Sequence, residues 1–223
     1  PRTWAANAWM GGLIADRFRD SRIVAFSTGN VYPLTPIHQG GSRETDPLLP
    51  IGEYAMSCVG RERLYTFMSQ THGTPVAIAR LNYACELRYG VLVDIARKVW
   101  TGEPVDVSMP AVNVIWQADA NAAALSLFAH ASSPPFVLNI AGPETLSVRQ
   151  AALDFGKLLQ CEPSFVGVEA NEALLSNGTV CHRLFGYPRV PIRQLIEWIA
   201  DWVRNDGVLW NKPTKFQVRD GKF

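Results

Sequence analysis

The stretch Arg22–Pro33, RIVAFSTGNVYP, indicates the fold class of this chain. Its first half is a short, continuous run of apolar and β-rich residues, which is typical of a strand buried within a parallel sheet. Its second half places the hydroxyls of Ser27 and Thr28 directly at the end of that strand. In open parallel sheets, ligands bind outside the carboxyl ends of the strands, so these residues are candidates for a functional site.

Two further segments on either side of the middle of the chain have the same character as this first strand. They are residues 75–81, PVAIARL, and residues 136–140, FVLNI. Apolar residues at helical spacing fill much of the chain around and between the strands. The expected helices cover residues 5–18, 54–70, 91–100, 147–159 and 192–203. Strands that alternate with helices predict an α/β fold with a parallel sheet.

The segment 28–52 is rich in Pro and Gly and is expected to form a long loop. Loops of this length within a compact domain usually have a function. The second notable motif, ETDPLLPIGEY at residues 44–54, begins within this segment and ends at Tyr54, where a helix is expected to open. The positive end of the helix dipole favours a phenolate at that position. Taken singly, a hydroxyl after a strand is more often a turn or cap, and a Tyr at a helix start more often packs.

Composition excludes several functional classes. The chain has 223 residues with 48% hydrophobic and 18% charged residues, which is typical of a globular protein. A formal net charge of +1 gives no long-range field that would attract nucleic acid or an anionic membrane. No apolar run is long enough for a membrane span, and no secretory signal is visible. The four cysteines are not spaced as metal ligands, so we expect free thiols, no metal and a cytoplasmic protein.

The motifs in this order resemble those of the extended short-chain dehydrogenase/reductases, which are NAD(P)-dependent sugar-nucleotide epimerases and dehydratases. The resemblance extends along most of the chain. It includes RLNY at 80–83, TGEPV at 101–105, VIWQAD at 114–119, NIAG at 139–142 and LFGYP at 184–188. It implies a Rossmann-like, doubly wound parallel sheet, of which this chain forms the C-terminal part, and a small α+β substrate-binding lobe. The sheet domain would comprise residues 1–82 and 110–145, and the lobe residues 83–109 and 146–223.

The resemblance also implies the chemistry of the site. Tyr54 would be the acid/base residue, assisted by Thr28, which orients the substrate hydroxyl or carbonyl. The residues implied to bind the cofactor are Asn7, Ser27 and Cys58, and those implied to bind the substrate are Asn30, Asn82 and Tyr83. The cofactor would be NAD or NADP, and the substrate a nucleotide sugar or a similar alcohol or carbonyl compound. A homodimer is an open alternative to a monomer.

The sequence departs from the family pattern one helical turn after Tyr54. The family has Lys four residues after this Tyr, on the same helix face, where its charge lowers the pKa of the phenol. Here Cys58 stands at that position, and a neutral thiol supplies no cation. A Tyr with a pKa of about 10 is a poor base at neutral pH. Arg61 lies on the same face, so one hypothesis places its guanidinium near the vacant Lys position; the alternative is a solvated surface residue.

The second departure concerns the cofactor. The family's N-terminal glycine-rich strand–turn–helix, which binds the pyrophosphate of a dinucleotide, is not found in this sequence. We therefore expect NAD or NADP binding to require that segment and to be weak in this chain alone. Two hypotheses follow. The first is an NAD(P)-dependent oxidoreductase of the epimerase type, because Gly29 and Asn30 follow Thr28 where a dehydratase needs an acid/base pair. The alternative is a catalytically impaired relative that binds a nucleotide or metabolite as a sensor or scaffold.

Overall fold

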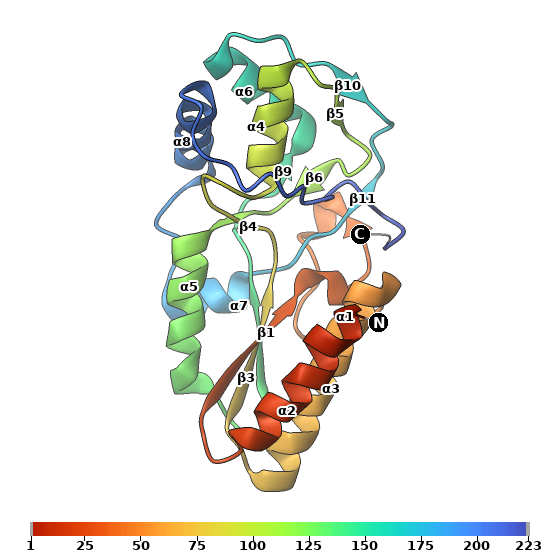
Figure 1. The fold of residues 1–223 in the computed structure, drawn as a ribbon, viewed down its shortest axis with the longest axis vertical. Helices are drawn as coiled ribbons and strands as arrows, with labels where there is room; N and C mark the ends of the chain where they lie inside the picture. Colours follow the sequence, from red (N-terminus) through yellow and green to blue (C-terminus); the bar gives the residue numbers. More distant parts are fainter. Residues whose placement is uncertain (1, 222–223) are drawn as a thin grey trace.

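A computed structural model describes residues 2–221 of the chain (Figure 1). Its central element is a parallel sheet of β1 (Ile23–Thr28), β3 (Val76–Leu81) and β8 (Phe136–Ile140), in the order β1-β3-β8. The register aligns Ser27 with Arg80, and Arg80 with Asn139. Three polar residues thus form a row across the sheet near the carboxyl ends of its strands. The predicted α/β fold with a parallel sheet is confirmed.

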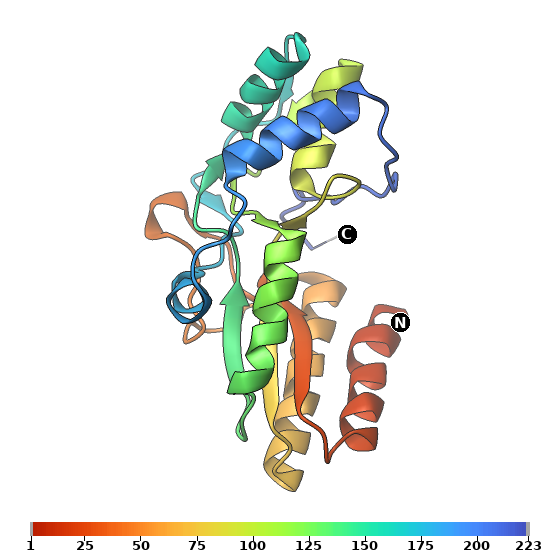
Figure 2. The same cartoon turned by 90° about the vertical axis from the view of Figure 1, so that its left-hand side faces the viewer.

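Helices cover both faces of this sheet (Figure 2). On one face, α2 (Met10–Arg17) and α3 (Gly52–His72) bury apolar side chains, among them Tyr65, against β1 and β3. On the other face, α5 (Gln117–Ser126) and α7 (Thr179–Phe185) pack on β3 and β8. The helix α3 ends where Gly73 adopts a φ of +72°, a left-handed conformation that favours glycine at the end of a helix.

The upper half of the molecule in Figure 1 lies beyond the carboxyl ends of the sheet strands. It is built around three helices, α4 (Val91–Thr101), α6 (Val148–Leu159) and α8 (Ile192–Arg204). Their inward faces enclose a separate apolar core that includes the fully buried Phe155 and Ile199. The upper half therefore has a core of its own, apart from the apolar clusters on the two faces of the sheet. A candidate site at the sheet edge lies between the two halves.

Short elements connect these parts. Their bounds are α1 (Arg2–Trp4), the π-helical turn η1 (Ala5–Trp9), the 3-10 turns η2 (Gly29–Val31), η3 (Ile37–Gln39) and η4 (Leu127–His130), and the strands β2 (Thr35–Pro36), β4 (Ala84–Cys85), β5 (Val105–Asp106), β6 (Ala111–Val112), β7 (Ile115–Trp116), β9 (Leu146–Ser147), β10 (Phe165–Val166) and β11 (Glu172–Ala173). The strands pair as β2 with β11, β4 with β7, β5 with β10 and β6 with β9.

The structure refines three expectations. The segment 28–52, expected as a loop, contains η2, β2 and η3, because pairing of β2 with β11 gives its backbone hydrogen-bond partners. The helix expected from Tyr54 begins at Gly52. The helix expected over residues 5–18 begins as the π-helical turn η1 and continues directly as α2 to Arg17. The domain bounds remain a prediction. Within residues 2–221, no helix has the length and apolar character that a bilayer span requires.

Candidate functional site

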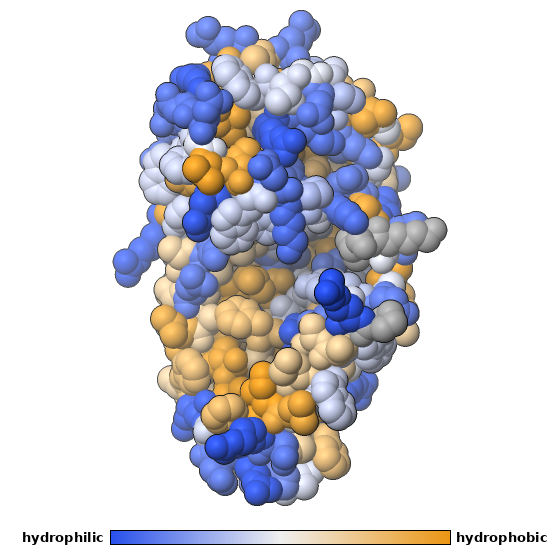
Figure 3. Space-filling model, in the orientation of Figure 1, coloured by the Kyte–Doolittle hydropathy of each residue, from blue (hydrophilic) through white to orange (hydrophobic). Residues whose placement is uncertain are grey.

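A cavity of about 590 Å³ lies between the carboxyl ends of the sheet strands and the upper half of the molecule. Figure 3 shows the surface hollowed at this level, between the two halves. Its lower wall includes Ser27 and Thr28 of β1 and Tyr54 of α3. The remaining lining residues are Asn30, Leu81, Tyr83, Ala84, Tyr89, Gly90, Val91 and the segment 212–216. The size is within the usual range for small-molecule sites.

The two candidate catalytic hydroxyls meet in this cavity. Thr28 ends β1 in an extended conformation, and its hydroxyl oxygen accepts the backbone N–H of Asn30 at 3.2 Å. Tyr54 lies in the first turn of α3 and is hydrogen-bonded to the side chain of Thr28. Thr28 is 6% exposed and Tyr54 is 38% exposed. A substrate oxygen in the cavity could therefore reach both hydroxyls.

The pKa of Tyr54 is raised from its ordinary value of 10.0. Burial is the main cause, and the neighbouring Cys58 raises the pKa further; the hydrogen bond from Thr28 and the charge of Arg61 act in the opposite direction. Burial also raises the pKa of Cys58, so both groups are neutral at neutral pH. In this state Tyr54 can donate a proton but cannot accept one.

Arg61 lies beside this pair on α3. One of its terminal nitrogens is 3.6 Å from the sulfur of Cys58, and the other donates to the side-chain oxygen of Asn7 at 3.2 Å. Asn7 in turn donates to the hydroxyl of Ser57 at 2.9 Å. Within residues 2–221, Arg61 is in none of the five ion pairs. Its charge lowers the pKa of both Tyr54 and Cys58.

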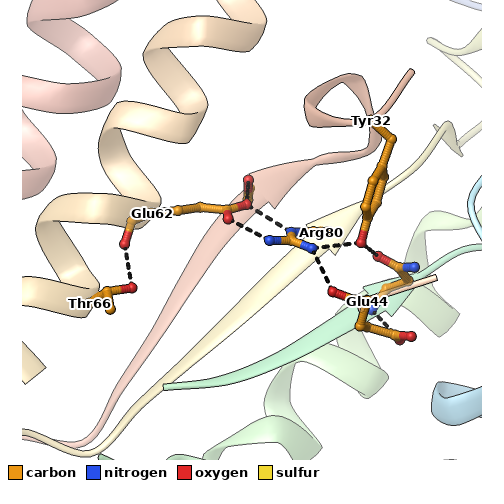
Figure 4. Close-up of polar contacts among 7 residues, drawn as sticks. Tyr32, Glu44, Glu62, Thr66 and Arg80 are labelled. Atoms are coloured by element: carbon orange, nitrogen blue, oxygen red, sulfur yellow. Dashed lines mark hydrogen bonds and ion pairs between the residues drawn. The ribbon is translucent and has the colours of Figure 1, made fainter. Parts of the chain in front are cut away.

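A buried polar network fixes α3 to the end of the sheet (Figure 4). Arg80 of β3 forms a two-pronged ion pair with Glu62 of α3, at 3.0 and 2.8 Å, with both side chains less than a tenth exposed. Ser27 donates to the same carboxylate at 2.5 Å. Arg80 also donates to the Tyr32 hydroxyl at 2.6 Å, and that hydroxyl donates to Asn139 at 2.9 Å. The network thus holds the helix that carries Tyr54 against the strand that carries Thr28.

The structure brings together five of the eight residues predicted for the site. Ser27, Thr28, Asn30, Tyr54 and Tyr83 all line the cavity. Ser27 contributes to the wall, although its hydroxyl is engaged by the Glu62 network.

The other three predicted residues lie outside the cavity lining. Cys58 is 0% exposed and packs with Val31 and Tyr32, so its thiol is not open to a ligand. Asn82 is 2% exposed and donates its side-chain N–H to Asn113 at 2.6 Å. Asn7 is held by its hydrogen bonds to Ser57 and Arg61. Their proposed contacts with cofactor and substrate remain predictions, and each would require a rearrangement of these bonds.

Sequence reasoning missed two parts of the site. It did not pair Glu62 with Arg80, although Glu62 lies two turns after Tyr54 and so on the same face of α3. It also missed the wall formed by residues 212–216, more than a hundred residues after β3. That segment has no periodicity, so the sequence contains no local signal for its position.

The glycines test whether the described chain could hold the pyrophosphate of a dinucleotide. In a dinucleotide-binding fold, the pyrophosphate lies at the start of a helix that follows a strand. Glycines at that turn leave open space beside their Cα atoms for it. Among residues 2–221, the glycines with open space at this position are Gly73, Gly102 and Gly186, and each follows the end of a helix. Gly29, which follows β1, is packed against Asn82. Among residues 2–221, the glycines therefore do not form a pyrophosphate cradle.

Comparison with known proteins gives structural matches only. No protein-family model matches the chain, and no curated protein does. Among solved structures, the UDP-glucose 4-epimerase of Thermus thermophilus in complex with NAD matches with a TM-score of 0.73 and 18% identity, over 86% of this chain and 68% of that one.

Two other solved structures match similarly. One is the UDP-glucuronic acid 4-epimerase of Bacillus cereus with UDP-glucuronic acid and NAD, with a TM-score of 0.75 and 16% identity, over 89% of this chain and 67% of that one. The other is the dTDP-glucose 4,6-dehydratase of Bacillus anthracis with NAD, with a TM-score of 0.73 and 16% identity, over 87% of this chain and 65% of that one. These matches confirm the Rossmann-like fold predicted from the sequence.

Proposed function

We propose that the chain is the catalytic part of an NAD(P)-dependent oxidoreductase that acts, as an epimerase does, on an alcohol or carbonyl group of a nucleotide sugar. The observation that carries this proposal is the hydrogen-bonded pair of Thr28 and Tyr54 in a cavity at the carboxyl ends of parallel strands. The structural neighbours support it, because the two epimerases were solved in complex with NAD, one of them also with UDP-glucuronic acid.

The hydroxyls of Thr28 and Tyr54 have different roles at the reacting oxygen of the substrate. Thr28 orients the substrate oxygen by hydrogen bonding, and Tyr54 exchanges the proton with it. When a carbonyl is reduced, the neutral phenol of Tyr54 gives up its proton to the forming hydroxyl. When an alcohol is oxidised, Tyr54 must first lose a proton to become the base. A nicotinamide, when bound, supplies or accepts the hydride. The raised pKa of Tyr54 therefore favours the reduction step near neutral pH.

Arg61 is proposed to supply the cation for this site. Its guanidinium contacts the sulfur of Cys58, at the position where the resembled family has Lys, and lowers the pKa of Tyr54. Replacement of Arg61 by Ala should raise the pKa of Tyr54 and slow alcohol oxidation, whereas Arg61→Lys should keep most of the rate. The readout is the pH profile of the rate, because a purely structural role would change stability without moving the profile. An unchanged profile in Arg61→Ala would remove Arg61 from the mechanism.

The experiment for the overall proposal is a calorimetric titration of the chain with NAD⁺, NADP⁺ and UDP-glucose. We expect UDP-glucose to bind and both dinucleotides to bind weakly, because residues 2–221 form no pyrophosphate cradle. Addition of both ligands should then produce reduced nicotinamide slowly in the oxidation step, before the hydride returns to the sugar in an epimerase-type cycle. No dinucleotide binding even at millimolar concentration, together with no turnover, would contradict the proposal.

One observation favours a second function. The thiol of Cys58 is buried and neutral, so the phenol beside it lacks the ammonium that would activate it. A catalytically impaired relative that binds a nucleotide or metabolite as a sensor or scaffold would have this arrangement. Binding of UDP-glucose without any turnover, unchanged by added NAD⁺, would support this second function over the first.

The oligomeric state and the location belong to the same proposal. We infer a homodimer and a cytoplasmic location. The homodimer is supported by exposed apolar side chains on η1 and α2, among them Trp9, Met10 and Leu13. Apolar surface patches of this kind often mark interfaces.

A further inference from the structure

The segment that follows α8 forms a wall of the cavity. After Arg204 the chain leaves the upper half and crosses between the two halves (Figure 1). Five consecutive residues of this segment, Lys212–Phe216, line the cavity that also contains Thr28 and Tyr54. Two of the five carry an ammonium group.

Specific contacts fix this segment in place. The backbone N–H and the hydroxyl of Thr214 both donate to one carboxylate oxygen of Asp94 on α4, at 2.7 and 2.6 Å. Phe216 is 5% exposed and belongs to the core of the upper half. Trp210 donates its backbone N–H to Arg88, and its ring stacks on that of Tyr89 with centroids 5.7 Å apart. The lysines on either side of Thr214 are therefore held at the cavity by anchored neighbours.

The charge at this wall is positive. Lys212 and Lys215 are both exposed, and neither takes part in an ion pair within residues 2–221. Among the described residues that line the cavity, none is Asp or Glu. The carboxylate of the nearby Asp94 is engaged by Thr214. Since the whole chain has a formal net charge of only +1, this excess of positive charge is a local feature of the cavity.

We propose that Lys212 and Lys215 form an anion subsite that binds the phosphate groups of a nucleoside diphosphate ligand, while Thr28 and Tyr54 face its other end. This inference rests on the proposed function in one respect, which is that the ligand of the cavity is a nucleotide sugar. An ammonium group is a compact point charge that attracts phosphate oxygens. That of Lys212 lies 5.9 Å from the centroid of the Tyr89 ring, which lines the same cavity. The aromatic side chains of Tyr83 and Tyr89 give the same cavity apolar surface.

The test is calorimetric titration with UDP, inorganic pyrophosphate and uridine. The proteins are the unmodified chain, Lys212→Ala, Lys215→Ala and the double variant. Lys157→Ala is the matched control. The side chain of Lys157, on α6, is 74% exposed and lies outside this cavity. All the substitutions are on exposed side chains, so the variants should fold.

We expect each single substitution at Lys212 or Lys215 to weaken UDP binding about tenfold, as loss of a charge-assisted hydrogen bond does. The control should change it by less than about twofold. Affinity for UDP should also fall with added salt, and less steeply in the double variant. Pyrophosphate should bind and uridine should not respond to the substitutions, which assigns the effect to phosphate rather than to the base.

Two results would overturn the subsite: no binding of UDP or pyrophosphate by the unmodified chain, or equal UDP affinity in the unmodified chain and the double variant. Neither measurement requires NAD or turnover. Lysine-dependent UDP binding without hydride transfer would therefore uphold the subsite while the proposed activity fails. Turnover of UDP-glucose with a KM unaffected by the double substitution would uphold the activity while the subsite fails.

Discussion

Whether the Tyr54 hydroxyl is protonated determines which reaction step the residues of the cavity can support. Burial raises the pKa of Tyr54 first, and the adjacent Cys58 adds to the effect. Thr28 and Arg61 oppose it without reversing it. The folded protein therefore keeps a phenol that donates its proton near neutral pH and becomes a base only in alkaline solution.

Replacement of Cys58 by Lys should lower the pKa of Tyr54, because it removes the raising effect of Cys58 and adds a cation one helical turn away. The rate of alcohol oxidation should then reach its plateau at a lower pH than in the unmodified chain. The measurement is the pH profile of oxidation with UDP-glucose and NAD⁺. Cys161→Lys, at a partly exposed thiol on the other half of the molecule, is the control and should leave the profile in place. A Cys58→Lys variant that folds and keeps the original profile would disprove this electrostatic account.

At the scale of single residues, the resemblance to the family singles out Thr28 and Tyr54, and the structure places both in the lining of one cavity. Thr28 follows a strand that its apolar run identifies, and Tyr54 opens a helix that its periodicity identifies. The burial of Cys58 and Asn82 was not predictable in the same way. It depends on which side chains of other segments pack over them, such as Val31 over Cys58 and Asn113 beside Asn82.

At the scale of elements, the ion pair of Glu62 and Arg80 joins α3 to β3. Both side chains are less than a tenth exposed, and each has hydrogen bonds besides the pair itself. The pair therefore sets the distance between the helix that carries Tyr54 and the strand end that carries Thr28.

Replacement of Glu62 by Gln should lower the free energy of unfolding by about 3–5 kcal/mol, because the charge of Arg80 is then buried without a partner. Urea unfolding followed by circular dichroism measures this. The control is Glu197→Gln, which breaks an exposed pair with Arg193 on α8 and should cost less than about 1 kcal/mol. A cost for Glu62→Gln as small as that of the control would show that the pair does not hold α3.

The long elements could be predicted from sequence, and the short ones could not. Continuous apolar runs identify β1, β3 and β8, and helical periodicity identifies α3, α4, α6 and α8. The two-residue strands have no pattern of their own, because their pairing is between distant segments, as with β2 and β11. The same holds for residues 212–216, which reach the cavity through anchors to Asp94 and to the upper core.

At the scale of the whole molecule, three of the four cysteines are buried in different parts of the structure. Cys58, Cys85 and Cys181 are each at most 3% exposed, while Cys161 is partly exposed. Burial raises the pKa of Cys85 to about 12 and that of Cys181 to about 11, from an ordinary value of 9.0. Above the ordinary thiol pKa of 9.0 and below the raised values of about 11 and 12, the folded chain keeps the thiols of Cys85 and Cys181 neutral, whereas the unfolded chain ionises them.

Folding should therefore protect three thiols from a disulfide reagent such as Ellman's reagent. We expect one thiol, that of Cys161, to react quickly in the folded chain at mildly alkaline pH, and all four to react in denaturant. Cys161→Ser is the control and should abolish the fast phase. Fast reaction of a second thiol in Cys161→Ser would contradict the burial described above.

The same groups predict how stability changes with pH. Because the pKa of Cys85 and of Cys181 is higher in the folded chain, their contribution to stability is complete below the ordinary thiol pKa of 9.0. It decreases as the pH rises above that value towards about 11 and 12, where the folded thiols also ionise. Urea unfolding across this range should show the decrease, and a Cys181→Ala variant should show less of it. A stability that is constant across this range would contradict the raised pKa values.

The measurement that tests the central claim most directly is the formation of reduced nicotinamide from NAD⁺ and UDP-glucose, compared between the unmodified chain and Tyr54→Phe. The comparison is made at millimolar NAD⁺ and alkaline pH, where Tyr54 is most able to act as the base. We predict measurable hydride transfer in the unmodified chain and a decrease of at least about a hundredfold in Tyr54→Phe, with UDP-glucose still bound. Equal rates in the two proteins, or no transfer in either while both ligands are bound, would contradict the assignment of Tyr54 as the acid/base residue.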